Sequence, residues 1–578
     1  MKKTIIQRPI PTNTQLTHLD PVLQRIYAAR GVNDDTALQR DARVLLPYQS
    51  LKGINDAVDL LVNALQQQLS IMIIGDYDAD GATSTSLAIR ALRAMGAKHV
   101  SYLIPNRFEY GYGLSPELVK VAAKQQPDLL ITVDNGISSL AGVCLAKEKG
   151  MQVLITDHHL PGEQLPEADV IVNPNQPDDA FPSKQLAGVG VMFYVLMALR
   201  ARLREMDWFS QHNIIEPNLA QWLDIVALGT VADVVPLDQN NRVLVHQGLQ
   251  RIRAGHCVPG IKALATVAGR ELTKMTASDL GFVFGPRLNA AGRLDDMSIG
   301  IACLLADDET QAHQLAMQLQ QLNHERRHIE KTMQKTAWEI VDQLKLSDNL
   351  PCGLCLFDEG WHQGVIGIVA SRIKDKVHRP VIVFALENEG LMKGSARSIS
   401  GLHVRDALAA IDAAHPNLIQ KFGGHAMAAG LTIARDQFEQ FQKLFADEVK
   451  RRVSEDDLQA KMLTDGELTE RELTLGLAEL LQQSGPWGQA FPEPLFEGEF
   501  ELADQRIVGE KHLKMTLRKG DRLLDAIAFF VDTSAWPNQH CDALRIVYKL
   551  DVNEYMGNRR LQLIVEYMEP KGIQVNVF

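Results

Sequence analysis

Acidic and histidine side chains recur directly after short apolar runs of this sequence. One run leads into Asp76-Tyr77-Asp78-Ala79-Asp80-Gly81, a second into Asp134-Asn135-Gly136, and a third into Asp157-His158-His159, while Asp233 follows a longer apolar stretch. Like charges in one site would force some of these carboxyls to stay protonated unless cations neutralise them. Carboxylate and imidazole ligands without cysteine suit Mn²⁺ or Mg²⁺. Two such ions can act together on a phosphodiester, so the pattern predicts metal-dependent phosphodiester hydrolysis.

The surrounding pattern predicts the elements that must hold these side chains. From about 45 to 240, helix-like stretches alternate with short apolar runs at 71–74, 129–133, 153–156 and 170–172. This alternation is typical of an α/β fold with a doubly wound parallel sheet. Because the carboxyl ends of parallel strands lie along one edge, we expect the acids to converge in a crevice there.

Two simpler interpretations apply to the first acidic motif. The sequence Asp76-x-Asp78-x-Asp80-Gly81 also opens like a calcium loop, but such a loop needs glutamate at its twelfth position, where this chain has Leu87, and a helix in place of the preceding strand. Alternatively, each acid could only cap the helix that follows it. Capping accounts for any one strand end more readily than for three together.

The whole chain is expected to divide into five parts. They are an N-terminal segment at 1–45, the catalytic unit at 46–300, a helical connector at 301–350, a smaller α/β unit at 351–455, and a linker and β-barrel at 456–578. Residues 301–350 contain no glycine or proline and predict one or two long helices. The smaller unit should have strands near 353–357 and 381–384, helices at 365–377 and 404–414, and a glycine-rich turn at 423–430. Beyond about 495, short alternating runs predict the barrel.

Composition limits the classes of protein that fit. The net charge of −12 is unusual for a protein that binds nucleic acid, but residues 501–578 contain 11 Lys and Arg against 11 Asp and Glu, so the acidic excess lies upstream. Six scattered cysteines indicate a reducing compartment, and a buried structural role is expected for Cys352 and Cys355. Neither a signal peptide nor a membrane-spanning segment is evident, so a cytoplasmic protein without membrane association is expected.

Taken in order, the acidic motifs and the later lone Asp233 resemble motifs I to IV of the DHH phosphoesterase superfamily, and Gly423-Gly424-His425 resembles its DHHA1 domain. Three further stretches resemble the single-strand-specific exonucleases of that superfamily: Pro105-Asn106-Arg107 with Gly111-Tyr112-Gly113-Leu114-Ser115, Gly285-Pro286-Arg287-Leu288-Asn289-Ala290-Ala291-Gly292-Arg293, and Gly394-Ser395-Ala396-Arg397-Ser398. The resemblance covers about residues 45 to 570. Ala396 departs from it, because glycine is common at that position.

The resemblance implies a 5′→3′ exonuclease that is specific for single-stranded DNA, acts in recombination and repair, and releases 5′-mononucleotides with two Mn²⁺ or Mg²⁺ ions. The implied metal ligands are Asp78, Asp80, Asp134, His158 and Asp233, with Asp134 as the bridge. Asp76, Asp157 and His159 would be the other catalytic residues. The implied substrate and phosphate contacts are Arg107, Arg287, Asn289, Arg293, Ser395, Arg397 and His425.

The resemblance also implies that the barrel is an OB-fold. Its basic residues, Arg506, Lys511, Lys514, Arg518, Arg559 and Arg560, would suit a groove for the strand. Tyr548 and Tyr555 are candidates for base stacking, although an aromatic residue on a strand more often belongs to the core. A single-strand-binding protein and a RecQ-type helicase are implied as partners.

Several alternatives remain open on the sequence. Arg287 and Arg397 are expected in glycine-rich turns that bind phosphate, whereas Arg293 could equally pair with Asp295 or Asp296. The turn at 423–430 could simply enter a helix. As to function, the chain could instead be a DHH phosphodiesterase for short oligonucleotides or cyclic dinucleotides, or a non-catalytic replication scaffold with a DHH fold.

Overall fold

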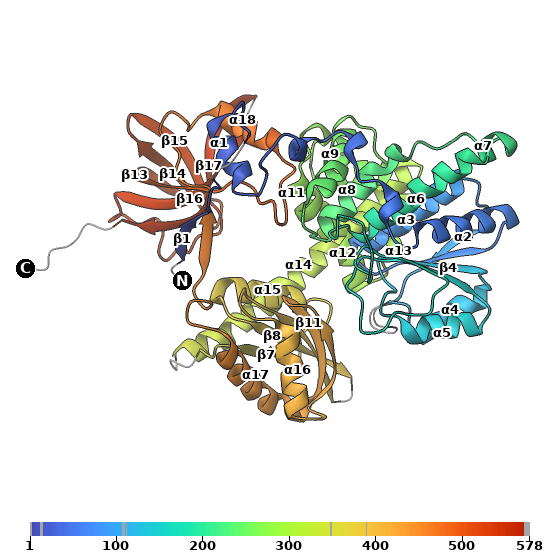
Figure 1. Ribbon diagram of the computed structural model, residues 1–578. Coiled ribbons are helices and arrows are strands. Elements are labelled where there is room, and N and C mark those ends of the chain that lie inside the picture. Colours follow the sequence, from blue (N-terminus) through green and yellow to red (C-terminus); the bar gives the residue numbers. More distant parts are fainter. Residues whose placement is uncertain are drawn as a thin grey trace, which may run out of the picture.

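The computed structural model describes residues 3–11, 15–106, 110, 113–346, 350–388, 390–555 and 557–571. Two α/β units are joined by one long helix, α14 (Glu309–Leu346), and a β-barrel lies beside them (Figure 1). Within these residues, none of the helices combines the length and the apolar character needed to cross a membrane.

A five-stranded parallel sheet forms the centre of the first unit, in the order β3-β2-β4-β5-β6. Its strands are β2 (Ile71–Ile74), β3 (Val100–Leu103), β4 (Leu129–Val133), β5 (Gln152–Thr156) and β6 (Val170–Val172). All of β2 and β4 is buried, as expected for strands covered on both faces. The predicted doubly wound sheet is therefore confirmed.

Helices cover the two faces of this sheet because alternate strand residues point in opposite directions. Ile71 and Ile73 of β2 belong to the core that includes α2 (Ile54–Gln67), α3 (Ala79–Ala94), α6 (Gly188–Glu205) and α8 (Leu223–Ala232). Met72 and Ile74 face α4 (Pro116–Ala122) and α5 (Leu140–Glu148).

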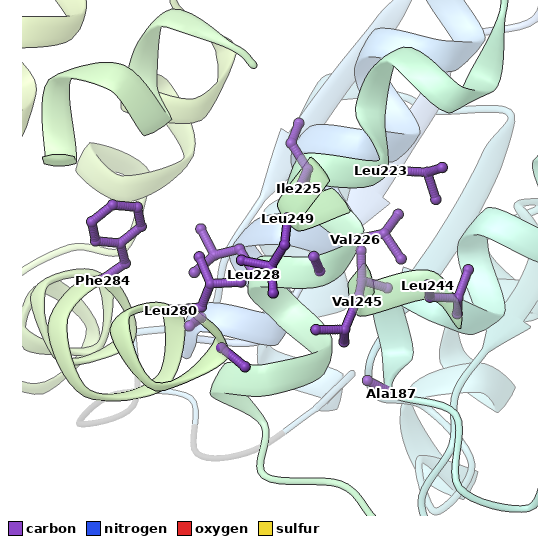
Figure 2. Close-up of a cluster of buried hydrophobic side chains, with 14 of the residues drawn as sticks. Ala187, Leu223, Ile225, Val226, Leu228, Leu244, Val245, Leu249, Leu280 and Phe284 are labelled. Carbon is purple, nitrogen blue, oxygen red and sulfur yellow. The ribbon is translucent and has the colours of Figure 1, made fainter. Parts of the chain in front are cut away.

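Further helices extend the first core away from the sheet. They are α7 (Trp208–Gln211), α9 (Gln239–Arg253), α10 (Pro259–Val267), α11 (Ala277–Asp279), the π-helix η7 (Leu280–Phe284), α12 (Gly285–Leu294) and α13 (Ser298–Leu305). Figure 2 shows side chains of α8, α9 and η7 meeting in this core, with Leu280 beside Leu228. The connector predicted at 301–350 is thus α13 followed by the single helix α14.

The second unit has a mixed sheet in the order β10-β11-β9-β8-β7. Its strands are β7 (Leu354–Phe357), β8 (Val381–Asn388), β9 (Leu391–Arg397), β10 (Ile419–Gly424) and β11 (Ala428–Ala434), and its helices are α15 (Ile366–Val377), α16 (Val404–Ala414) and α17 (Phe438–Arg452). The glycine-rich segment at 423–430 does not enter a helix. It forms the β10–β11 hairpin, in which Gly423 pairs with Gly430.

The C-terminal strands close into a barrel in the order β13-β14-β15-β17-β16, which confirms the prediction. They are β13 (Phe496–Val508), β14 (His512–Lys519), β15 (Arg522–Ala528), β16 (Ala543–Tyr555) and β17 (Asn558–Pro570). Tyr548, a candidate for base stacking, is fully buried against Phe496 and Phe500. The alternation that places Leu544 and Ile546 inside places this ring inside as well, so it belongs to the core.

The N-terminal segment packs on the barrel unit. Strand β1 (Thr4–Gln7) pairs in parallel with β12 (Lys461–Thr464), and α1 (Pro21–Ala28) lies beside α18 (Leu475–Ser484) (Figure 1). Arg30 follows α1 and forms two hydrogen bonds, of 2.6 and 2.9 Å, with the buried carboxylate of Asp465. This ion pair joins parts of the chain that are 435 residues apart.

Breaking this ion pair should destabilise the barrel unit. Asp465→Ala leaves the Arg30 guanidinium buried without its partner, which costs about 3–5 kcal/mol of unfolding free energy. Urea unfolding followed by tryptophan fluorescence measures the loss, since Trp487 stacks on Tyr27 in the same unit. As a control, Asp41→Ala removes the partner of the exposed Arg43 and should leave the unfolding midpoint unchanged. Equal midpoints for both variants would contradict a structural role for the buried pair.

Candidate active site

The loop after β2 supplies the first group of acids. Asp78 caps α3 by accepting a hydrogen bond from the Gly81 N–H at 3.0 Å, and Asp80 lies in the first turn of that helix. The Asp80 carboxylate accepts hydrogen bonds from the N–H groups of Gly188 at 2.6 Å and Val189 at 3.0 Å. These donors are the first residues of α6, and a helix N-terminus favours negative charge. The Asp80 side chain is therefore fixed by two helices.

Asp134 enters the site from the end of β4. Its backbone has φ +62°, a left-handed conformation that is uncommon outside glycine. The next residue, Asn135, donates hydrogen bonds to the carbonyls of Ile74 at 3.0 Å and Val133 at 2.9 Å, which ties the end of β4 to β2. A Cβ at Gly188 would lie 2.5 Å from the Asp134 Cβ, so glycine is required for the approach of α6.

The third group follows β5, where Asp157 organises the two histidines. The Oδ1 atom of Asp157 accepts hydrogen bonds from the N–H groups of His158 at 2.7 Å and His159 at 3.1 Å, and it lies 2.7 Å from His159 Nδ1. Its Oδ2 atom accepts a hydrogen bond from the Ile137 N–H at 2.9 Å. Asp157 thus sets the conformation of the pair, while the His158 ring points toward other acids.

His158 links the three groups. Its Nε2 atom lies 3.1 Å from Asp134 Oδ1 and 3.5 Å from Asp233 Oδ2. Three overlapping sets of side chains have ligand atoms within 4.8 Å of one another: Asp76, Asp78 and Asp134; Asp80, His158 and Asp233; and Asp134, His158 and His159. The structure therefore brings all eight predicted catalytic and metal-ligating residues together, with Asp157 held behind the histidines.

The electrostatics of this cluster are unfavourable for its acids. Burial and then the charge of Asp233 raise the pKa of Asp80 to about 7. Burial and the charge of Asp78 likewise raise the pKa of Asp233 to about 7. The pKa of Asp134 is raised well above its usual value by burial and then by Asp80. Carboxyls in such surroundings are stabilised as anions only when cations lie beside them.

The histidines differ in protonation. Burial alone would lower the pKa of His159, but its hydrogen bond to Asp157 and the charge of that group raise it to about 9. The pKa of His158 is lowered by burial and by the charge of His159, which favours the neutral imidazole that a metal requires. Buried carboxylates, one neutral imidazole and the absence of cysteine fit a pair of divalent ions such as Mn²⁺ or Mg²⁺.

The second α/β unit presents polar side chains toward this cluster. His425, in the β10–β11 hairpin, has its pKa lowered by burial and then by the charge of His159, which places the hairpin within electrostatic reach of the histidine pair. The two units also touch directly, since Arg293 Nη1 donates a 3.0 Å hydrogen bond to the Gly364 carbonyl. Arg293 therefore contacts the second unit at this boundary, whereas the sequence suggested that it binds phosphate or pairs with a nearby aspartate.

Ser395 and Arg397 form a compact polar pair beside the same boundary. The Arg397 Nη1 atom donates hydrogen bonds to Ser395 Oγ at 2.9 Å and to the Ala396 carbonyl at 2.8 Å. A Cβ at Gly367 of α15 would lie 2.8 Å from Arg397 Nη2. Arg397 was expected in a glycine-rich turn, but it is the last residue of β9, where Ala396 fits as a buried strand residue.

The structure corrects the expected setting of Arg287 and gives Asn289 a contact within the protein. Arg287 lies within α12 and not in a turn, and it is buried, with Nε donating to Gln320 Oε1 at 2.8 Å and Nη1 to the Val283 carbonyl at 2.5 Å. Asn289 Oδ1 accepts a 2.7 Å hydrogen bond from the Ala79 N–H, so its side chain holds the first acidic loop. Arg107, Gly111 and Tyr112 lie outside the described residues.

Sequence reasoning missed the residues that position the acids from a distance. The N–H groups of Gly188 and Val189, which hold Asp80, come from a helix more than 100 residues later. In the sequence, Asn135 stands out only as part of the motif Asp134-Asn135-Gly136. The run Ala187-Gly188-Val189-Gly190 was the available signal, because paired glycines at a helix start often permit a close backbone approach.

Three family models match this chain. The N-terminal domain of the DHH family matches residues 70–230, the DHHA1 domain matches residues 350–451, and the RecJ OB domain matches residues 464–567. These ranges correspond to the parallel-sheet unit, the mixed-sheet unit and the barrel. The residues that hold the acidic cluster lie mostly within the first range.

Relatives align along nearly the whole chain. The single-stranded-DNA-specific exonuclease RecJ of Dickeya dadantii (strain 3937) is 55% identical over 98% of both chains, and that of Escherichia coli (strain K12) is 54% identical over 96% of both. The crystal structure of Thermus thermophilus RecJ in complex with Mn²⁺ matches with a TM-score of 0.80 and 30% identity, covering 99% of this chain and 80% of that one. A Mg²⁺ complex of the same protein matches with a TM-score of 0.74 and 28% identity, covering 98% and 78%. From its full-length identity to these relatives, the chain belongs to the RecJ family of single-stranded-DNA-specific exonucleases.

Proposed function

We propose that this protein is a metal-dependent exonuclease that removes 5′-mononucleotides from the 5′ end of single-stranded DNA, in recombination and repair. The observation that carries the proposal is the convergence of Asp80, Asp134, His158 and Asp233 in one buried cluster. The raised pKa values of Asp80 and Asp233 describe a site that is built for cations. The RecJ relatives supply the substrate class.

In this proposal, Asp78, Asp80, Asp134, His158 and Asp233 hold two Mn²⁺ or Mg²⁺ ions, and Asp134 serves both. When bound, such ions stabilise charge on a phosphodiester and lower the pKa of water. Asp76 joins the set beside Asp78 and Asp134.

The histidines divide the remaining work in this proposal. Asp157 keeps His159 protonated, so that its imidazolium faces the phosphate as a hydrogen-bond donor. His158 stays neutral and orients toward Asp134 and Asp233. His159 would therefore lose this contact as the pH rises through its pKa of about 9.

Recognition of the 5′ end is assigned to the second α/β unit. Arg397 is held by Ser395, and burial lowers the pKa of its guanidinium, so a phosphate anion would compensate a charge that is poorly solvated. His425 and Arg293 lie at the same boundary between the units. Arg107 belongs to the proposal from the sequence alone, whereas Arg287 and Asn289 would act by supporting α12 and the first acidic loop.

The barrel is proposed to hold the strand away from the chemistry. A cavity of about 360 Å³ on its outer surface is lined by Lys514, Asp525, Asn553, Asn558 and Arg560. Two cations among polar groups suit a sugar-phosphate backbone. A closed barrel of this kind would be superfluous for an enzyme restricted to dinucleotides, which favours long strands as the substrate.

Other parts of the proposal are carried over from the sequence patterns and the family resemblance. They include a single-strand-binding protein and a RecQ-type helicase as partners, a cytoplasmic location, and the domain boundaries at 46–300, 351–455 and 456–578. All six cysteines are free thiols, as a reducing compartment requires.

Removing the shared ligand should abolish hydrolysis. Asp134→Ala should reduce cleavage of single-stranded DNA below about a thousandth of the parent rate, a larger loss than the 10²–10³ that removal of one hydrogen-bond donor costs in an active site. Calorimetric titration with Mn²⁺ should show weaker binding, while circular dichroism and DNA affinity change little. The exposed Asp56→Ala is the matched control. Substantial residual cleavage by the Asp134 variant would refute its assignment as the bridge.

Arg397→Ala should erase the preference for a 5′-phosphate over a 5′-hydroxyl. A charge-assisted contact contributes about 1.5–3 kcal/mol, or roughly tenfold to a hundredfold in kcat/KM. The comparison uses matched single strands that differ only at the 5′ end. Lys514→Ala, on the barrel, should slow both substrates by the same factor. If Arg397→Ala also slows both equally, it is not an end sensor.

Removing the cations that line the barrel cavity should selectively weaken the binding of long strands. The double variant Lys514→Ala/Arg560→Ala should lower the slope of log K against log salt by about 1.4, since each phosphate contact on a single strand contributes about 0.7. Cleavage of very short oligonucleotides should persist. Lys549→Ala is the control, because Glu493 and Glu566 already neutralise that cation. A parallel loss on long and short strands would show that the barrel only supports the catalytic units.

A further inference from the structure

Phe282 is an aromatic side chain that protrudes from the surface, with 77% of its area exposed. It lies in η7, a single π-helical turn, and such turns frequently occur at functional sites. The packing of this turn does not need the Phe282 ring. Leu280 and Phe284, on the same turn, are fully buried and supply its core contacts.

The turn that carries Phe282 packs on the end of α8, directly before Asp233. A Cβ at Gly281 would lie 3.2 Å from Val231 Cγ1, and one at Gly285 would lie 3.2 Å from Ala232 Cβ. Figure 2 shows the same arrangement, with Leu280 of η7 beside Leu228 of α8. Phe282 is therefore anchored beside the segment that delivers an acid to the proposed metal site.

The residue after Asp233 adds a second exposed apolar group at this place. Val234 is 60% exposed and has φ +65°. A β-branched residue rarely adopts this left-handed conformation, and strained positions tend to persist where function requires them. Asp233 is thus bordered by apolar surface that the fold does not bury.

Arg287 contacts η7 directly, because its Nη1 atom donates a 2.5 Å hydrogen bond to the Val283 carbonyl, while the acidic Asp279 precedes the turn. Arg287, one turn along α12, has its pKa lowered by burial and then by the charges of Arg327 and Arg270. Arg327 is exposed on α14, whereas Arg270 pairs with Asp279 at 3.4 Å. Surfaces that bind single strands combine exposed aromatic rings, which stack on bases, with cations that contact phosphates.

We propose that the Phe282 ring stacks on a nucleobase of the substrate strand, close to the scissile phosphodiester. This inference rests on the proposed function and adds a substrate-binding residue outside the acidic motifs. Stacking tolerates any base, so Phe282 would secure the strand without imposing a sequence preference. It would hold the reacting phosphate in register with Asp233.

Scanning the strand with an abasic nucleotide tests the contact. A single abasic site is moved through the first six positions of a 5′-phosphorylated strand, and kcat/KM for cleavage with Mn²⁺ is measured for the parent and for Phe282→Ala. At one position, the abasic site should lower kcat/KM of the parent by about fivefold to a hundredfold, and this loss should disappear in the variant. Phe282→Trp should retain it. Ile215→Ala, at a residue 92% exposed after α7, should match the parent.

A spectroscopic measurement complements the rates. The strand carries 2-aminopurine at the sensitive position. Binding to the parent should quench the 2-aminopurine emission, both in EDTA and on mixing with Mn²⁺, whereas binding to Phe282→Ala should not. Phe282→Leu, which keeps apolar bulk without a ring, should behave like the alanine variant. Melting curves should coincide for all variants because the ring is exposed.

The outcomes separate this inference from the proposed function. If the parent cleaves single strands but the abasic cost is the same in Phe282→Ala, Phe282 does not stack on a base, and its exposure suits a protein partner instead. If Phe282→Ala lowers kcat/KM by the same factor at every position of the abasic site, the inference is overturned in the same way. If the parent does not cleave single strands at all, the proposed function itself fails.

Discussion

Five aspartates and two histidines occupy one buried crevice, and the repulsion among their charges is the constraint on which the rest of this structure depends. Burial and neighbouring acids raise the pKa of Asp80 and of Asp233 to about 7. Without cations, the folded protein would have to keep protons on these groups near neutral pH. Divalent ions remove this conflict, so the same burial that is unfavourable for the empty cluster makes it selective for metal.

The fold holds the acids together by directing backbone donors at them. Parallel strands bring three loop starts to one edge, and the N-termini of α3 and α6 point N–H groups at Asp78 and Asp80. Asn135 ties two strand ends, and Asp134 adopts an uncommon backbone conformation to enter the crevice. The mixed-sheet unit then approaches from the other side, where the Arg293 contact with Gly364 fixes the boundary. In the proposed function, chemistry and end recognition belong to different units that meet at one cluster.

The acidic site was largely predictable because all of its motifs except Asp233 follow a strand, and parallel strands leave no choice about where their ends lie. The long connector and the closed barrel were predictable from periodicity for similar local reasons. Contacts between distant segments were not. The sequence could not reveal that Arg287 turns inward to Gln320 or that Asn289 holds the Ala79 N–H. The glycines at 423–430 suggested a turn, but pairing with β9 made them part of a sheet, because a partner strand outweighs local propensity.

The central claim is that the crevice is a two-metal site bridged by Asp134. Crystals of the full chain grown with Mn²⁺ and measured near the manganese absorption edge test it most directly, since anomalous difference density identifies the ions without reference to activity. The account predicts two peaks about 3.5–4 Å apart, both within ligand distance of Asp134, with His158 on one of them. Density for a single ion remote from Asp134, or no peak in the crevice at saturating Mn²⁺, would contradict it.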